Sequence, residues 1–480
     1  MRRVRLPAAC LFAACLLALP FAAAGPAVAA PPRPNVVYIL ADDLGWKDVG
    51  FHGSDIRTPN IDRLAAGGVR LEQFYAQPFC TPTRAALLTG RYPHRYGLQT
   101  VVIPSAGTYG LATDEWLLPQ ALQQAGYRTA IVGKWHLGHA DRKYWPRQRG
   151  FDYAYGPVLG EIDYFTHSAH GTTDWYRDNQ LLQEEGYVTT LLGNDAVRFI
   201  DAQSADTPFF LYLAFTAPHA PYQAPQAYLD RFAHIADPSR RAYAAMISAM
   251  DDEIGRVVAA LDRRGLRDDT LIVFQSDNGG PRSARFTGEV DTSGMTIPAD
   301  NGPYRDGKAS YYEGGTRVVA LANWPGHIPA GSIVDQPIHV VDIYPTLAAL
   351  AGASTAQAKP LDGVDVWETI SAGAPSPRRE VVYGIEPFRA ALREGNWKLV
   401  WRTTLPSQVE LFDLATDPGE TTNVAAAHPA EVAKLQQRAE ALAREAAPPL
   451  FIVEAVGAAK STLLSTVAIP QDDRALAEQP

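Results

Sequence analysis

The stretch that decides the fold is Asn35-Val36-Val37-Tyr38-Ile39-Leu40-Ala41, followed directly by Asp42-Asp43. A continuous apolar run of this length is typical of a strand buried on both faces of a parallel sheet. Similar runs recur at residues 129–132, 209–215 and 270–274. Helical patterns lie between them, most clearly at 243–264, where one apolar stripe ends at a glycine. Alternating strands and helices predict an α/β fold with a mostly parallel central sheet flanked by helices.

The pattern changes from about residue 378. Short strands are predicted at 381–385, 388–393, 397–401 and 410–414, and a helix from 429 to 446. We therefore predict a signal peptide at 1–29, a catalytic α/β domain at 30–377, and a smaller C-terminal α+β subdomain with a short antiparallel sheet and a tail at 378–480. The tail after Ala447 has no clear periodicity.

The N-terminal segment has an arginine-rich start, an apolar centre and a small-residue Ala-Val-Ala end, which is the pattern of a secretory signal peptide. Its removal takes away Cys10 and Cys15 and leaves Cys80 as the sole cysteine of an exported, periplasmic or secreted protein. An odd cysteine in such a protein indicates an intermolecular bridge, a reactive thiol or a modified residue; the alternative is an inert buried cysteine.

The composition is that of a globular protein, with 46% hydrophobic and 20% charged residues. The leader contains three arginines and no acid, so its loss changes the net charge from −9 to about −12. An acidic surface argues against a nucleic-acid partner and against a polybasic membrane anchor. Beyond the leader, the sequence shows no apolar run long enough to span a bilayer.

Four polar clusters come directly after four predicted strands, and ligands bind at this carboxyl edge of open α/β sheets. Each cluster alone also fits a solvated turn or a surface group, but four at one edge are hard to explain by chance. The clusters are Asp42-Asp43, Gly133-Lys134-Trp135-His136-Leu137-Gly138, Pro218-His219 and Asp277-Asn278.

The oxygen donors among these clusters form a hard-donor set: Asp42, Asp43, Asp277 and Asn278. Such a set suits Ca²⁺, or Mg²⁺ if the geometry is tighter, and does not suit Zn²⁺.

Cys80 lies at the start of a short predicted helix that has Thr81 as N-cap and Gly90 as its end. Helix N-termini favour anions, and Arg84, one turn further on, can reach back to hold one. An unmodified thiol here would be acidic and reactive, which raises a thiol-nucleophile hypothesis. A thiol gains no obvious advantage from a hard, oxygen-bound cation.

These residues carry a family resemblance. Cys80-Thr81-Pro82-Thr83-Arg84, with Thr89-Gly90-Arg91 behind it, resembles the sulfatase signature C-x-P-x-R followed by T-G-R. The resemblance extends over nearly the whole mature chain, and within the family it is greatest to the arylsulfatase B group, which acts on 4-sulfated N-acetylgalactosamine. It includes Thr58-Pro59-Asn60-Ile61-Asp62, the four clusters above, Lys308 ahead of Glu313-Gly314-Gly315, and Leu411-Phe412-Asp413-Leu414.

The resemblance implies an alkaline-phosphatase-like fold and hydrolysis of an aryl or carbohydrate sulfate ester. It also implies that a formylglycine-generating enzyme converts Cys80 to formylglycine. A calcium ion would be bound by Asp42, Asp43, Asp277 and Asn278 with residue 80 alongside, and Arg84 would steady residue 80. Around the sulfate would lie Lys134, His136, His219 and Lys308.

The chemistry agrees with this assignment, because an aldehyde hydrates to a geminal diol whose one hydroxyl can attack sulfur. His219 or Lys308 would protonate the leaving oxygen, and His136 would accept a proton from the second hydroxyl. Candidate substrate-lining residues lie at 161–167 and in the loop 280–305, although both stretches also fit solvated loops. Two alternatives stay open: a phosphomonoester or phosphonate hydrolase of the same superfamily, and a non-catalytic glycan-binding protein if Cys80 is unmodified.

Overall fold

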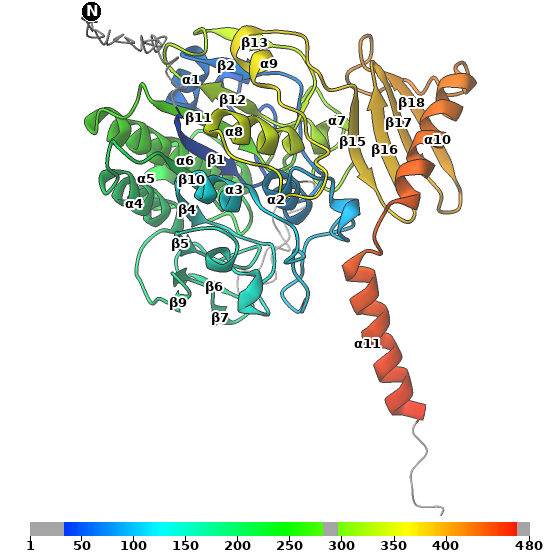
Figure 1. Cartoon of the computed structure of the whole chain (residues 1–480), viewed down its shortest axis with the longest axis horizontal. Helices are drawn as coiled ribbons and strands as arrows, with labels where there is room; N and C mark the ends of the chain where they lie inside the picture. The colour runs from blue at the N-terminus through cyan, green and yellow to red at the C-terminus, as the bar shows by residue number, and fades with distance from the viewer. Residues whose placement is uncertain (1–32, 282–295, 468–480) are drawn as a thin grey trace, which may run out of the picture. The chain divides into compact units, whose positions relative to one another are not determined.

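The computed structural model describes residues 33–281 and 296–467 of the chain. The predicted signal peptide lies outside these residues. In the described part, the central sheet has ten strands (Figure 1). Their order is β13 (Ser332–Val334), β2 (Val69–Leu71), β12 (Ala320–Asn323), β11 (Thr270–Ser276), β1 (Asn35–Ala41), β10 (Phe209–Ala214), β4 (Arg128–Gly133), β5 (Tyr153–Gly156), β8 (Tyr176–Arg177) and β9 (Gln180–Leu181).

The middle of this sheet is parallel. β1 pairs with β10 and β11, β10 pairs with β4, and β4 pairs with β5, all in parallel register. Antiparallel pairing occurs toward the edges, between β11 and β12, between β12 and β2, and between β5, β8 and β9. The prediction of a mostly parallel central sheet is confirmed.

Helices cover both faces of the sheet, which explains why all seven residues of β1 are buried. Alternate β1 side chains enter two different cores, with Tyr38 in one and Ile39 in the other. Residues of α2 (Cys80–Thr89), α3 (Leu118–Gln124), α8 (Ile343–Ala351) and α9 (Trp367–Ala372) join the first core. The second contains residues of α1 (Pro59–Ala66), α4 (Val188–Asp201), α5 (Gln226–Arg231) and α6 (Pro238–Arg263).

Two predicted helix starts are wrong. The helix predicted from residue 243 is α6, which begins at Pro238 because Asp237 caps it by accepting a hydrogen bond of 2.7 Å from the Arg240 N–H. In α2 the N-cap is Phe79 and the first helical residue is Cys80, so Thr81 is not the cap. The Thr81 hydroxyl instead donates to the main-chain oxygen of His136 at 3.0 Å.

The C-terminal sheet is separate and fully antiparallel, in the order β15 (Glu380–Ile385), β16 (Arg389–Glu394), β17 (Trp397–Arg402) and β18 (Gln408–Asp413). Gly395 has φ 59° in the turn between β16 and β17, as the predicted hairpin requires. The helix α10 (Pro429–Arg444) packs on this sheet (Figure 1). The predicted C-terminal α+β architecture is confirmed, while the domain boundary at 377/378 stays a prediction.

A further helix, α11 (Leu450–Val467), occupies the stretch in which we found no periodicity. It begins with a nearly continuous apolar run and leaves Phe451, Val453 and Val456 exposed. A helix without a distinct polar face gives no amphipathic period in the sequence, which is why it was missed. No helix among the described residues is both long and apolar enough to cross a membrane.

The remaining elements are short. Two small sheets pair β3 (Phe74–Tyr75) with β14 (Ile338–His339) and β6 (Ser168–Ala169) with β7 (Thr172–Thr173), and α7 spans Glu313–Thr316. Single 3₁₀ turns occur at Gly50–His52, Pro93–Arg95, Arg142–Tyr144, Pro146–Gln148 and Val340–Asp342.

Candidate active site

The polar residues that follow β1 and β11 meet at the carboxyl edge of the sheet, as predicted. The Asp277 N–H donates to the Ala41 oxygen at 2.9 Å, and the Asp43 N–H donates to Asp277 Oδ1 at 3.2 Å. Asn278 Nδ2 donates to Asp43 Oδ1 at 2.8 Å. Asp43 has φ 67°, so the chain turns sharply where β1 ends. Parallel pairing of β1 with β11 therefore brings two distant sequence clusters into one buried site.

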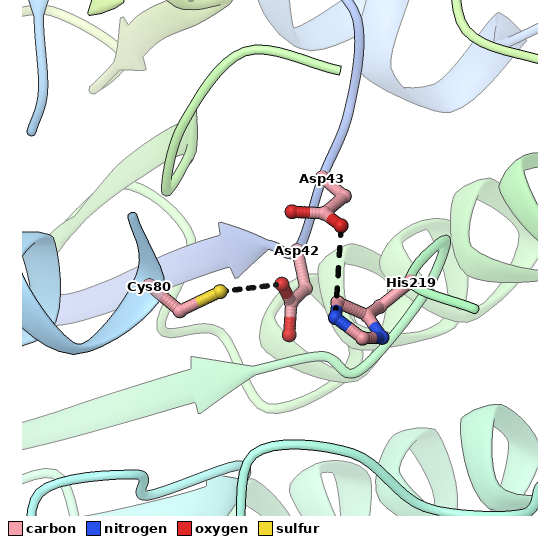
Figure 2. A group of neighbouring side chains, drawn as sticks. All are labelled: Asp42, Asp43, Cys80 and His219. Atoms are coloured by element: carbon pink, nitrogen blue, oxygen red, sulfur yellow. Dashed lines mark hydrogen bonds and ion pairs between the residues drawn. The ribbon is translucent and has the colours of Figure 1, made fainter. Parts of the chain in front are cut away.

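A cation fits the donor atoms of this site. Asn278 Oδ1 is buried and has no hydrogen-bond partner in the described part of the chain, which is costly for an amide oxygen. Asp42, Asp43, Cys80 and His219 each offer one possible ligand atom, and these atoms all lie within 4.8 Å of one another (Figure 2). Carboxylate and amide oxygens suit a hard cation such as Ca²⁺ or Mg²⁺.

Three cationic side chains bind the carboxylates. Arg84 Nη2 lies 2.9 Å from Asp277 Oδ2 and 3.4 Å from Asp42 Oδ2, and the Lys134 ammonium donates to the same Asp42 oxygen. Lys308 Nζ lies 2.8 Å from Asp43. Three positive charges thus balance the three carboxylates before any cation binds. An added divalent cation would make the site positive and suited to an anionic ligand.

These charges and the burial shift the pKa values of the carboxyl groups in opposite directions. Burial raises the pKa of Asp277 to about 6, and the nearby Asp42 charge adds to the rise. Burial also acts to raise the pKa of Asp42, but Lys134, His219 and Arg84 outweigh it and hold that pKa well below its usual range. Asp42 is therefore ionised, and its Oδ1 lies 3.4 Å from Cys80 Sγ.

Cys80 occupies the first turn of α2, with Sγ 3.4 Å from Asp42 Oδ1 (Figure 2). Its side chain is buried, and burial together with the charges of Asp277 and Asp42 raises the thiol pKa well above its ordinary value. The expectation of an acidic, reactive thiol is therefore wrong for unmodified Cys80, because burial and the neighbouring carboxylates raise its pKa.

The surroundings of both histidines lower their pKa values. Burial and the charges of Lys134 and Arg84 lower the pKa of His136 well below its usual value. Burial and Lys308 lower the pKa of His219, whose Nε2 lies 3.6 Å from Asp43 Oδ2. Burial acts to lower the pKa of the Lys308 ammonium group, but the nearby Asp43 charge outweighs this effect, so the pKa is raised.

A cavity of about 410 Å³ opens over this cluster. Cys80, His136, His219 and Lys308 line it, whereas Arg84 and Lys134 lie fully buried beneath. The structure therefore brings all the predicted site residues together, in two layers. The upper layer faces the cavity and the lower one holds the carboxylates.

The predicted substrate-lining stretch 161–167 is only partly at the cavity. Glu161 lines it, while Ile162 and Tyr164 are buried in the core. Most of the loop 280–305 lies outside the described residues.

The wall residues that the sequence analysis missed are Phe79, Val102, Ile103, Pro104, Ser105, Leu159, Gly160 and His170. His170 and Gly171 both have positive φ, 52° and 76°, between β6 and β7. A two-residue hairpin turn with glycine in second place is therefore the signal that could have located His170.

A buried ion cluster fastens the Lys308 loop to the C-terminal sheet. Lys398 Nζ on β17 lies 2.8 Å from Glu313 Oε1 and 2.9 Å from Glu420 Oε1, and the Lys398 and Glu313 side chains are fully buried. Between Glu313 and the site, the Ala309 N–H donates to the Pro78 oxygen at 2.9 Å, and the Lys308 N–H donates to the Gly280 oxygen at 2.9 Å. The sequence analysis did not identify this cluster.

Among known protein families, the sulfatase family matches this chain over residues 34–353. The chain belongs to the sulfatase family. This is a family of sulfuric ester hydrolases, so the site described above is that of an enzyme. The narrower likeness to the arylsulfatase B group stays a prediction.

Individual sulfatases match over most of the chain. Mouse arylsulfatase J is 38% identical over 79% of the chain, which spans 63% of that relative's length. Mouse N-acetylgalactosamine-6-sulfatase is 34% identical over 88% of this chain and 83% of its own. Ps i-CgsB, solved in complex with k-i-k-neocarrahexaose, is 34% identical with a TM-score of 0.79, covering 87% of this chain and 94% of that one.

Proposed function

We propose that this sulfatase hydrolyses a carbohydrate sulfate ester, with a formylglycine formed from Cys80 and a divalent cation beside it. The observation that carries the proposal is the position of Cys80 Sγ, 3.4 Å from Asp42 Oδ1 and at the floor of the cavity. Burial and the Asp277 and Asp42 carboxylates raise the pKa of the Cys80 thiol well above its ordinary value. Conversion to an aldehyde explains better than thiol chemistry why the site keeps it there.

The cation would be held by Asp42, Asp43, Asp277 and Asn278, with residue 80 alongside. Its contribution would be positive charge next to the sulfate oxygens. The partnerless Asn278 Oδ1 supports this assignment, because a hard cation would satisfy it. We favour Ca²⁺, with Mg²⁺ as the alternative.

Formylglycine would supply a hydrated aldehyde, with one hydroxyl to attack sulfur and a second that allows sulfate to be released. Arg84 and Lys134 hold the Asp42 carboxylate from below. Lys134 and Lys308 offset the negative charge of the sulfate, and His219 or Lys308 donates a proton to the leaving oxygen. His136 accepts a proton from the second hydroxyl.

A sulfated sugar is the favoured substrate class because two of the matched proteins carry sugar ligands or sugar names, Ps i-CgsB and N-acetylgalactosamine-6-sulfatase. The lining of the cavity includes the apolar residues Val102, Ile103 and Pro104 as well as polar Glu161 and His170. A sugar ring presents both an apolar face and hydroxyl groups to such a pocket. We further propose export through the 1–29 leader and maturation by a formylglycine-generating enzyme.

Peptide mass spectrometry tests the proposal directly. Trypsin cleaves after Arg70 and Arg84, so the peptide 71–84 contains residue 80. We expect the aldehyde in this peptide and turnover of an aryl sulfate by the same preparation. The ratio of kcat/KM on aryl sulfate and aryl phosphate then separates a sulfatase from a phosphate or phosphonate hydrolase. Aldehyde without sulfate-ester turnover would overturn the proposal.

A further inference from the structure

The imidazole of His136 is held unusually tightly for a side chain that lines a cavity. Its backbone has φ 60°, a region that residues other than glycine rarely adopt, and its N–H donates to the Val158 oxygen at 3.2 Å. Nε2 lies 3.1 Å from the main-chain oxygen of Ile103. Nδ1 is buried and has no hydrogen-bond partner among the described residues.

The Ile103 contact decides which ring nitrogen carries hydrogen. A carbonyl oxygen can only accept a hydrogen bond, so Nε2 must be the donor. In the neutral ring the lone pair is then on Nδ1. The partnerless nitrogen is therefore the one that can accept a proton.

Gly160 leaves the space that the imidazole ring occupies. A Cβ atom at residue 160 would lie 2.1 Å from His136 Cε1, 2.3 Å from Nε2 and 2.7 Å from Nδ1, all far inside van der Waals contact. Only glycine leaves room for the imidazole here. The segment is itself held by Asp174, whose carboxylate accepts hydrogen bonds from the N–H groups of Val158 at 3.2 Å and Leu159 at 2.8 Å.

Thr81 joins the two backbone segments that hold the ring. Its hydroxyl donates to the His136 oxygen at 3.0 Å and accepts from the Ile103 N–H at 3.1 Å. The same threonine thus places His136 and the residue whose carbonyl contacts its Nε2. Thr81 is fully buried, and it is the neighbour of Cys80 in the chain.

We propose that Thr81, Ile103 and Gly160 are positioning residues that fix His136 as the tautomer with hydrogen on Nε2 and the lone pair on Nδ1. The inference rests on the proposed function in one respect: His136 is the group that accepts a proton from residue 80. Thr81 is fully buried, whereas Ile103 and Gly160 line the cavity. All three act through the orientation and tautomer of the ring.

The tautomer is measured without any turnover. In the full chain labelled with ¹⁵N at histidine and carrying unmodified Cys80, long-range ¹H–¹⁵N spectra show which ring nitrogen bears hydrogen, and His136→Gln assigns the signal. We expect hydrogen on Nε2 in the wild type. Hydrogen on Nδ1, or exchange between both nitrogens, overturns the proposal even if the enzyme is a sulfatase.

Variants then test the three contacts. Gly160→Ala and Thr81→Val should each lose the fixed pattern, whereas Thr81→Ser should retain it because the hydroxyl remains. Gly457→Ala is the matched glycine control, since an added Cβ there meets no atom within 4 Å. If Gly160→Ala does not fold, the wild-type spectrum and the Thr81 pair still decide the outcome. An unchanged pattern in Thr81→Val overturns the role of Thr81.

Activity gives the second readout, on preparations matched for formylglycine content. We expect kcat of Gly160→Ala to fall roughly 100-fold, the size of a lost proton-transfer contribution, with KM within about threefold of the wild type. A raised KM with kcat unchanged would show that Gly160 shapes the substrate pocket, which overturns the positioning role. Absence of sulfatase activity in the wild type would refute the proposed function and leave the tautomer result standing.

Discussion

Replacing Lys134 by methionine tests the electrostatic design of the site most directly. The Lys134 ammonium is fully buried and bonded to Asp42 Oδ2, and Arg84 Nη2 lies 3.4 Å from the same oxygen. Methionine keeps most of the apolar stem and removes the charge. The change therefore leaves one buried carboxylate with a weaker set of partners.

Lys134→Met should lower both kcat and the folding stability, and the two losses have different physical causes. Loss of one preorganised positive charge beneath the cavity costs about 3 kcal/mol of transition-state stabilisation, or about 150-fold in kcat. Breaking a buried ion pair costs about 3–5 kcal/mol when the remaining charge has no other partner. Since Arg84 still faces Asp42, we expect the loss of folding stability to lie at the lower end, about 3 kcal/mol.

The assay measures kcat on an aryl sulfate and the thermal midpoint of the same Lys134→Met preparation, with and without added Ca²⁺. Added Ca²⁺ should raise the midpoint of the variant more than that of the wild type, because Asp42 lacks its ammonium partner. Lys143→Met is the matched control, since the Lys143 side chain is 55% exposed and its ion pair is with surface Asp141. A kcat within threefold of the wild type would refute the reasoning.

Two further predictions concern the same site. Cys80→Ala should abolish sulfate-ester hydrolysis while the thermal midpoint stays near that of the unmodified protein; wild-type turnover would exclude the proposed chemistry. Asn278→Ala should lose the Ca²⁺-induced rise in thermal midpoint, and an undiminished rise would show that Asn278 is no ligand.

Burial raises the pKa of Asp174 to about 7, so the folded state keeps a proton that the unfolded state has released, and stability falls as pH rises from about 4 to about 7. Between pH 5 and pH 8, the free energy of unfolding of the wild type should fall by about 2 to 3 kcal/mol more than that of Asp174→Asn. The control Asp206→Asn, at an exposed position, should lose as much as the wild type. If Asp174→Asn behaves like this control, the raised pKa of Asp174 is contradicted.

Several of the residues that sequence reasoning located have positions that follow from a strand. Asp42 and Asp277 come directly after apolar runs, and parallel strands end at one edge, so their meeting could be predicted before any coordinates existed. The paired strands β1 and β11 then supply the contact, with the Asp277 N–H bonded to the Ala41 oxygen. Lys134 and His219 follow β4 and β10 in the same way.

Other features depend on contacts between segments that carry no shared pattern. The Thr81 hydroxyl looked like a helix cap from its neighbours Cys80 and Pro82, yet it binds His136, 55 residues away. Gly160 gave no turn signal because its requirement is space beside an imidazole, not a special backbone angle. Helix α11 was missed because its apolar residues are not confined to one face.

The contacts of the C-terminal sheet could not be predicted from the sequence either. A change of sequence pattern near residue 378 indicates a new subdomain, but it does not show which side chains connect that subdomain to the α/β domain. Lys398 on β17 lies between Glu313 and Glu420, and Arg389 on β16 donates to the Ala309 oxygen at 3.1 Å. Ala309 is the residue after Lys308, and Lys308 faces Asp43. Removing the Lys398 charge would leave two buried carboxylates close together, which is strongly destabilising. The sheet therefore belongs to the framework that sets where the Lys308 ammonium stands over the catalytic cavity.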